Sequence, residues 1–212
     1  MNLLLTLSRF IDAVTERIGR TVYWLVLVAV LISAANASVR KIFNYSSNSF
    51  LEIQWYLFSL IFLFCAGYTL KNNEHVRIDI ITGRLSAQAR AWIDIFGTIF
   101  FLLPMAALIM YLSWPVFVEA WTRHEVSTNA GGLIIWPARL MVPVGFFLLI
   151  AQALSELIKR IAFLKGLIPD PSEKHVVKTA EEELAEEILR SRGDLAIAQE
   201  IEGIGVGRVE PK

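Results

Sequence analysis

Four long apolar stretches constrain the fold of this 212-residue chain more than any other feature of its sequence. They lie near residues 21–41, 51–71, 92–121 and 133–158. Each is long enough to cross a hydrocarbon core of about 30 Å as a helix, which needs about 20 residues. Runs such as "YWLVLVAVLI" lack the alternation of a membrane β-barrel strand, and a single strand in lipid leaves its backbone unpaired. We therefore expect an all-α membrane protein with four transmembrane helices.

Composition supports this class, because 55% of the residues are hydrophobic, too many for an ordinary soluble domain of this length. The formal net charge of +0 leaves no basic excess for nucleic acid, so we expect no nucleic-acid partner. The third stretch exceeds one straight crossing and contains Pro104 and Pro115, which lack a backbone donor. We expect that span to be tilted or bent.

The distribution of Lys and Arg predicts the orientation, since cationic side chains resist translocation. Ten of them flank one set of span ends: Arg9, Arg17, Arg20, Lys71, Arg77, Arg84, Arg90, Lys159, Arg160 and Lys165. The opposite side has Arg40, Lys41 and Arg123, with Arg139 ambiguous inside the start of the fourth span. Both termini are therefore expected in the cytoplasm.

The first 20 residues have the pattern of an amphipathic helix lying on the membrane surface. Apolar residues recur there at helical spacings: Leu3, Leu7, Phe10, Ile11, Val14 and Ile18. The alternative is a secretory signal cleaved after Ala37, because basic residues, an apolar run and "SAANAS" follow one another. We favour the interfacial helix, since a signal has a short basic lead in place of such a helix.

Two further segments lie outside the predicted spans. Residues 77–90 alternate apolar and charged side chains at three- and four-residue steps, which predicts a second interfacial helix resting on membrane lipid; a short polar loop is the alternative. Residues 167–212 are charged and contain no aromatic residue, so they are expected to form a solvated cytoplasmic tail. Its glutamates would serve solubility or, alternatively, docking.

No motif for catalysis or cofactor binding is apparent. His75, His124 and His175 are scattered over different connections, and Cys65 is the single cysteine, so we expect no metal and no haem. Phosphate-binding loops and nucleophile elbows are also missing from the sequence. We expect a protein that is not an enzyme and uses no cofactor.

Polar residues at the membrane borders are the remaining candidates for function, because a carboxylate in a span is presumed to face protein, water or a cation. They are Glu52, Gln54, Arg77, Asp79 and Asp94, and a cluster formed by Glu119, Arg123, His124 and Glu125. For Glu52 we consider three roles: helix capping or packing against another subunit, pairing with a basic residue of this chain, and a direct part in ion or substrate movement. Asp94 fits a structural role at a helix start, and the cluster is either a solvated loop or a docking site.

The stretch "EIQWYLFSLIFLFCAGYTLKNNEHVRIDI" resembles the small membrane subunit, of DctQ type, of tripartite ATP-independent periplasmic (TRAP) transporters. Further similarity lies in "WIDIFG", "SWPVFVEAW" and "GGLIIWPARLMVPVGFFLLIAQALSELIK", so the resemblance extends over about residues 20–166. The long tail departs from the compact pattern of this family.

The resemblance implies a division of labour in the bacterial inner membrane. A large subunit of DctM type moves the substrate, usually a carboxylate, with an ion gradient that is usually sodium, and a periplasmic substrate-binding protein delivers it. The small subunit braces the large one and contributes part of the docking surface, for which Glu119, Arg123, His124 and Glu125 are our candidates. Glu52 and Gln54 would make polar interhelical contacts, and Arg77 and Asp79 would tie the interfacial helix to the bundle or to lipid headgroups.

Two other classes compete with this interpretation. A membrane anchor or assembly subunit of a redox complex is also small and helical, but the absence of paired histidines from the sequence argues against haem. An independent channel or carrier would have to transport a solute by itself, and the sequence lacks two broken half-helices in mirrored positions. The identity of the substrate cannot be read from this chain.

Overall fold

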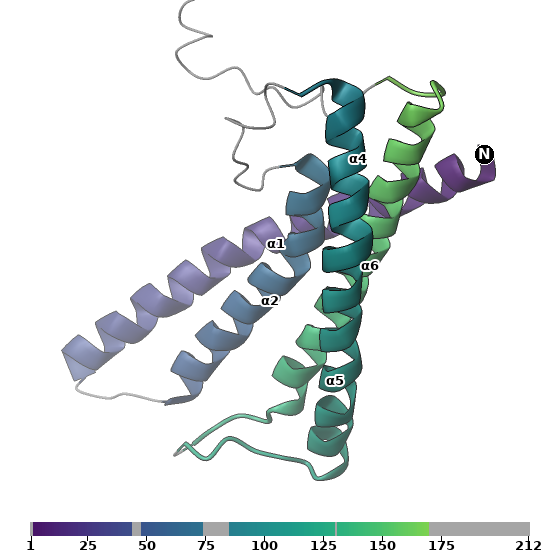
Figure 1. Ribbon diagram of the computed structural model, residues 1–212. Helices are drawn as coiled ribbons and strands as arrows, with labels where there is room; N and C mark the ends of the chain where they lie inside the picture. Colours follow the sequence, from purple (N-terminus) through teal and green to yellow (C-terminus); the bar gives the residue numbers. More distant parts are fainter. Residues whose placement is uncertain (1, 44–47, 74–84, 130, 170–212) are drawn as a thin grey trace, which may run out of the picture. The chain divides into compact units, whose positions relative to one another are not determined.

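The computed structural model describes residues 2–43, 48–73, 85–129 and 131–169, which lie in the first of two compact units, Met1–Ser172. Its helices are α1 (Asn2–Phe43), α2 (Asn48–Asn72), α4 (Ala87–Gly97), the π-helix η1 (Thr98–Leu102), α5 (Leu103–Thr122) and α6 (Trp136–Leu164) (Figure 1). Because α4, η1 and α5 follow one another without a break, four helical segments are long and apolar enough to cross a membrane. The predicted all-α class with four spans is confirmed.

Helix α1 is a single element of 42 residues, where we expected an interfacial helix over 1–20 and a separate span over 21–41. The two segments join without a break, because Gly19 continues the helix and no proline interrupts its hydrogen bonds. The string "SAANAS" also lies inside α1. That the first half rests on the membrane surface stays a prediction.

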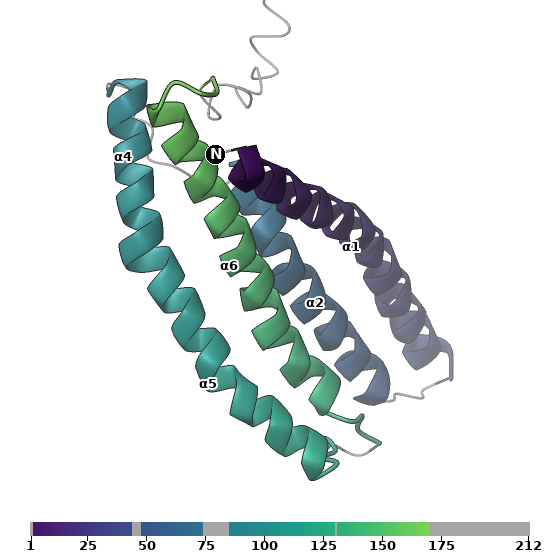
Figure 2. The same cartoon turned by 90° about the vertical axis from the view of Figure 1, so that its right-hand side faces the viewer.

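The third span is bent, as its length and prolines predicted. Figure 2 shows α4, η1 and α5 as one curved rod beside α6. The π-turn lies directly before Pro104, and the Leu103 N–H bonds to the carbonyl oxygen of Thr98, five residues earlier. Pro104 has no N–H to continue the regular ladder, and a π-bulge is a recognised cause of such a bend.

Helix α4 begins at Ala87, where Ser86 caps it by accepting a hydrogen bond from the Ala89 N–H at 3.3 Å. Residues 87–90, which we expected to end an interfacial helix, are therefore the first turn of the third span. Most of the expected interfacial helix, including Arg77 and Asp79, lies outside the described residues. A separate helix over 77–90 thus stays a prediction only for its first part.

Helix α6 ends in a Schellman turn. Gly166 has a φ of +69°, its N–H bonds to the carbonyl oxygen of Phe163 at 2.8 Å, and the Leu167 N–H bonds to that of Ala162 at 3.0 Å. Helix α6 thus continues six residues past residue 158, where we expected the fourth span to end. The tail beyond residue 169 lies outside the described residues.

Small residues bring α2 and α6 together. A Cβ atom placed on Gly145 would lie 2.7 Å from Leu63 Cβ and 3.1 Å from the Leu63 carbonyl oxygen. Gly67 lies against Gln152 and Thr15, where an added Cβ would meet Gln152 Cβ at 3.6 Å. Such small residues let helix backbones approach closely. Close packing matters in lipid, because the hydrophobic effect does not drive helices together there.

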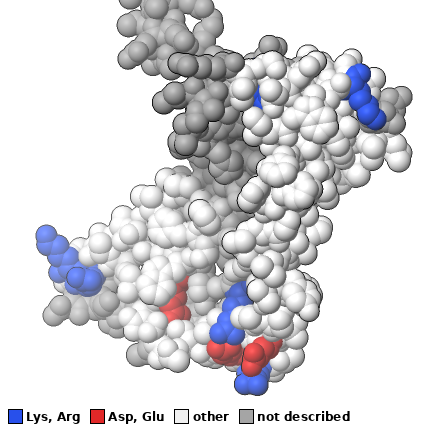
Figure 3. All heavy atoms as spheres, viewed as in Figure 1, with Lys and Arg blue, Asp and Glu red and all other residues white. Residues whose placement is uncertain are grey.

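Burial in the described helices is opposite to that of a water-soluble bundle. The buried apolar residues are mostly alanines, together with Val22 and Ile95, whereas large side chains such as Phe62 and Tyr111 are more than 70% exposed. In Figure 3 the middle of the displayed face is largely white, and charged atoms lie toward its ends. An apolar exterior with small and polar residues inside is expected when the surrounding solvent is lipid.

Candidate functional site

Glu52 holds the connection between α5 and α6. It lies near the start of α2, is 4% exposed, and accepts hydrogen bonds from the Leu133 N–H at 2.6 Å and the Asn129 side-chain amide at 2.8 Å. The Ser127 hydroxyl is its third partner. A carboxylate with several donors is well compensated for burial. These partners are neutral groups of the same chain, so the geometry matches none of the three roles considered for Glu52; it is a structural contact within the chain, and we call the four residues the Glu52 clamp.

The same face of α2 carries two more contacts to this connection. Ser49 bonds to the carbonyl oxygen of Gly131, and the Tyr56 hydroxyl donates to that of Ile134 at 3.1 Å. Residues 49, 52 and 56 are spaced by three and four, so they share one face of the helix. The connection itself is a small hairpin, with an isolated antiparallel bridge between Val126 and Ile134. Helix α2 thus determines the position of the hairpin.

Gln54 points elsewhere. It lines a groove between α1 and α2 together with residues near the end of α1, including Asn36 and Arg40. The two polar residues that the sequence analysis grouped, Glu52 and Gln54, therefore serve different contacts. Two positions along a helix correspond to a rotation of about 200°, which explains the separation.

The predicted cluster at residues 119–125 consists of two ion pairs on the surface. Arg123 Nη2 lies 3.1 Å from Glu119 Oε1, one helical turn apart, and both side chains are more than half exposed. Glu125 accepts two hydrogen bonds from Arg139, at 2.5 and 2.8 Å. His124 is exposed and has a φ of +48° at the end of α5. Arg139, which the sequence left ambiguous, thus belongs to this end of the bundle.

At the opposite ends of the helices, Asp94 of the third span forms an ion pair with Arg160 of α6. Arg160 is 8% exposed, so the pair is mostly removed from solvent. We expected Asp94 to act on its own helix start, but the partner comes from another helix. This pair fastens the third span to the fourth, because separating two such charges in a poorly solvated environment is unfavourable.

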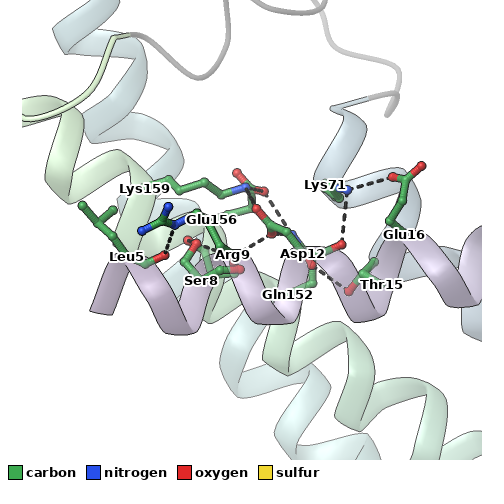
Figure 4. A network of polar contacts seen from close by, with 11 residues as sticks. Leu5, Ser8, Arg9, Asp12, Thr15, Glu16, Lys71, Gln152, Glu156 and Lys159 are labelled. Atoms are coloured by element: carbon green, nitrogen blue, oxygen red, sulfur yellow. Dashed lines mark hydrogen bonds and ion pairs between the residues drawn. The ribbon is translucent and has the colours of Figure 1, made fainter. Parts of the chain in front are cut away.

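A larger polar cluster joins α1 to α6 near these ends, and sequence reasoning missed it (Figure 4). Asp12 Oδ1 accepts hydrogen bonds from Ser155 at 2.8 Å and from the Gln152 amide at 2.9 Å. Lys159 Nζ lies 3.1 Å from Asp12 Oδ2 and 2.5 Å from Glu156 Oε1. We call this set the Asp12 cluster: Ser8, Asp12, Thr15, Gln152, Ser155, Glu156 and Lys159.

Helix α2 joins the cluster through Lys71. Its ammonium group lies 2.7 Å from Glu16 Oε2 and donates to the carbonyl oxygen of Asp12 at 3.2 Å. Lys71 and Lys159 therefore balance most of the charge of Asp12, Glu16 and Glu156. Three spans, α1, α2 and α6, meet at this one point.

A sequence signal for the Asp12 cluster existed on both helices. Ser8, Asp12 and Thr15 recur at steps of four and three, on the side of α1 opposite to the exposed Leu7 and Phe10. Residues 152, 155, 156 and 159 repeat the same spacing in an otherwise apolar stretch of α6. These two matching polar stripes predict a contact between α1 and α6.

No group of three or more His, Cys, Asp or Glu residues suited to a metal ion occurs in the described part of the chain. Cys65 lies within α2, partly buried. In the Glu52 clamp, and likewise in the Asp12 cluster, the polar side chains bond chiefly to groups of the same cluster. Their arrangement can hold helices and a loop in place, and it presents no nucleophile paired with a base.

The fold defines a helical protein with four segments able to cross a membrane, and the polar groups of its two clusters bond within the chain. The chain matches the sequence model of the family described as "Tripartite ATP-independent periplasmic transporters, DctQ component" over residues 29–163. This match covers more than half of the chain, and the chain therefore belongs to the DctQ family of TRAP transporter components. Searches of curated proteins and of solved structures gave no match.

Proposed function

We propose that this chain is the small subunit that braces the large, DctM-type subunit of a TRAP transporter in the bacterial inner membrane. The observation that carries the proposal is that buried polar groups bond within the chain. Inside the described helices, the buried residues Glu52, Gln152 and Ser155 bond within the chain, while large apolar side chains face outward. Such a body offers a rigid apolar surface to a larger membrane partner and to lipid.

Family membership supplies the partners of this proposal. TRAP components work together, so the small subunit would assemble with the large transport subunit and a periplasmic substrate-binding protein. The cargo would be a carboxylate, and the driving force an ion gradient, usually of sodium. These finer points rest on the resemblance described above.

Docking of the periplasmic protein is assigned to the surface beside the hairpin. Glu119 and Arg123 form an exposed ion pair there, and His124 and Glu125 follow at the end of α5. Exposed charged groups of both signs suit a transient, electrostatically steered contact. The Glu52 clamp would hold the hairpin beside this surface in one position.

This surface would lie outside the cell, and the charge distribution supports this orientation, because Lys and Arg are concentrated at the opposite ends of the spans. On the cytoplasmic side, the exposed apolar stripe of α1, including Leu3, Leu7 and Phe10, would contact lipid. The polar stripe of the same helix faces α6 through the Asp12 cluster. Both termini are then cytoplasmic.

The proposal is tested by reconstitution into liposomes with an imposed sodium gradient. We expect carboxylate uptake only when this chain, the large subunit and the binding protein are all present. Uptake by this chain alone would overturn the scaffold role. Full uptake by the large subunit and the binding protein without this chain would overturn it as well.

The docking assignment has a separate test. Charge reversal of the exposed pair in Glu119→Lys and Arg123→Glu should raise the concentration of binding protein needed for half-maximal uptake several-fold, without reducing co-purification of the large subunit. The matched control is Arg9→Gln, an exposed change at the far end of α1. An unchanged requirement in both reversed variants would remove this surface from the docking site.

A further inference from the structure

A groove of about 570 Å³ lies between α1 and α2, near the end of α1 and the start of α2. The Glu52 clamp and the groove both involve the first turns of α2, but on different faces of that helix. The groove is lined by Ser33, Asn36, Ala37, Arg40, Lys41, Leu51 and Gln54. Its size is within the range of small-ligand sites.

Two cations stand at one end of this groove. Arg40 and Lys41 form the last turn of α1, and Figure 3 shows a blue patch where that helix ends. Neither forms an ion pair with any residue in the described part of the chain. Attraction to the negative end of the helix explains a cation in this turn. It does not explain the neutral donors that line the rest of the groove.

Those donors are one hydroxyl, of Ser33, and two side-chain amides, of Asn36 and Gln54. Among the described residues, neither amide bonds to another group of the chain, in contrast to Gln152 in the Asp12 cluster. No Asp or Glu lines the groove. The combination of two cations with neutral donors complements a phosphate diester and ester oxygens.

The surroundings of the groove indicate an amphiphile. Trp55, next to Gln54, is 63% exposed, as is typical of the aromatic belt at headgroup level. Toward the middle of α1, Val30 and Leu31 are exposed and offer an apolar surface for an acyl chain. A ligand here would have its phosphate beside the cations and its tail along α1.

We propose that this groove binds an anionic glycerophospholipid, with Arg40 and Lys41 at the headgroup phosphate and Ser33, Asn36 and Gln54 at the glycerol and ester oxygens. Two cations without a nearby carboxylate favour a headgroup with net negative charge over a zwitterionic one. The bound lipid would fill the seam between α1 and α2. This inference does not depend on the transport role.

The test uses the full chain purified in detergent and titrated separately with phosphatidylglycerol, phosphatidylcholine and inorganic phosphate. Native mass spectrometry counts the bound lipid, and thermal unfolding follows stabilisation. We expect tighter binding and a higher unfolding midpoint with phosphatidylglycerol than with phosphatidylcholine. In Arg40→Gln/Lys41→Gln, affinity for phosphatidylglycerol should fall about thirtyfold.

The matched control is Arg123→Gln, which removes an exposed cation outside the groove and should keep full affinity. A second variant, Ser33→Phe, retains both charges and fills the groove, so it should also lose binding even if the double variant folds poorly. Equal binding of phosphatidylglycerol by all variants, or of both lipids by the wild type, would overturn the proposal. An equal effect of inorganic phosphate would show a site for free anions and overturn the lipid assignment.

Discussion

Ser8 and Ser155 lie 147 residues apart in the chain, yet their hydroxyl oxygens are 2.7 Å from each other and both residues are almost fully buried. This contact places the first turns of α1 against the last turns of α6. It belongs to the Asp12 cluster, in which α1 turns its polar stripe to the protein and leaves its apolar stripe exposed. A helix that would face the opposite way in water is thereby suited to lipid.

Asp12 is the central acceptor of this cluster, so its removal should be costly. Asp12→Ala removes one acceptor from each of the donor groups of Gln152, Ser155 and Lys159, which keep only their contacts to Glu156 and Ser8, and we expect a loss of about 2 kcal/mol in the free energy of unfolding. Thermal unfolding of the purified chain in detergent measures it. Arg9→Gln, on an exposed side chain of the same helix, should change stability by less than about 0.5 kcal/mol. Equal midpoints for the two variants would contradict the central role of Asp12.

The Glu52 clamp predicts local ordering of the hairpin. Glu52→Ala removes the acceptor of the Leu133 N–H, so amide hydrogen exchange over residues 126–135 should become faster by at least about tenfold. Exchange in α6 should hardly change. Gln54→Ala is the matched control, because Gln54 lines the groove between α1 and α2 and forms none of the hydrogen bonds of α2 to the hairpin described above. Unaltered exchange at Leu133 in Glu52→Ala would show that the hairpin holds its conformation without Glu52.

Close approach of α2 and α6 at Gly145 can be tested with a single methyl group. Gly145→Ala would place its Cβ 2.7 Å from Leu63 Cβ, so the helices must separate, at a cost of about 1–3 kcal/mol. Gly97→Ala is a matched control, because nothing lies within 4 Å of an added Cβ there. It should be neutral or slightly stabilising, since alanine favours a helix over glycine. If Gly145→Ala unfolded at the same temperature as Gly97→Ala, the tight packing would be refuted.

The orientation of the chain in the membrane can be tested by labelling from outside the cell. In a Cys65→Ala background, a cysteine at Thr128 in the hairpin should react with a membrane-impermeant maleimide in spheroplasts, and one at Leu167 after α6 should react only after lysis. Both positions are exposed in the structure. Because residues 128 and 167 flank one span, labelling of both from the same side would contradict the proposed topology. Labelling at residue 167 in spheroplasts, with labelling at residue 128 only after lysis, would show the opposite orientation.

Much of the fold was predictable because every segment that crosses lipid must satisfy its own backbone hydrogen bonds. Each apolar stretch had to be a helix, and α2 and α6 overlap the predicted spans 51–71 and 133–158, although α6 ends six residues later than predicted. The bend in the third span also followed from its prolines. The continuity of α1 could not be predicted, because hydropathy shows a change of environment and carries no information on whether a helix ends there.

The candidate site was harder to predict. Glu52 drew attention as a polar residue in a costly place, but its partners come from residues 127–133, about 80 positions later in the chain. Asp94 was expected to act on its own helix and instead pairs with Arg160. Pairings over such distances depend on which helix faces meet, and one sequence does not contain that information.

The sequence by itself determined the class of this protein: four apolar helices and the motifs of the DctQ family. These follow from the cost of placing backbone and charge in lipid, which every segment meets on its own. Only the tertiary structure decided how Glu52, Asp12 and Arg160 are used. Their compensation for burial comes from groups distant in the chain, so it exists only once the helices have packed.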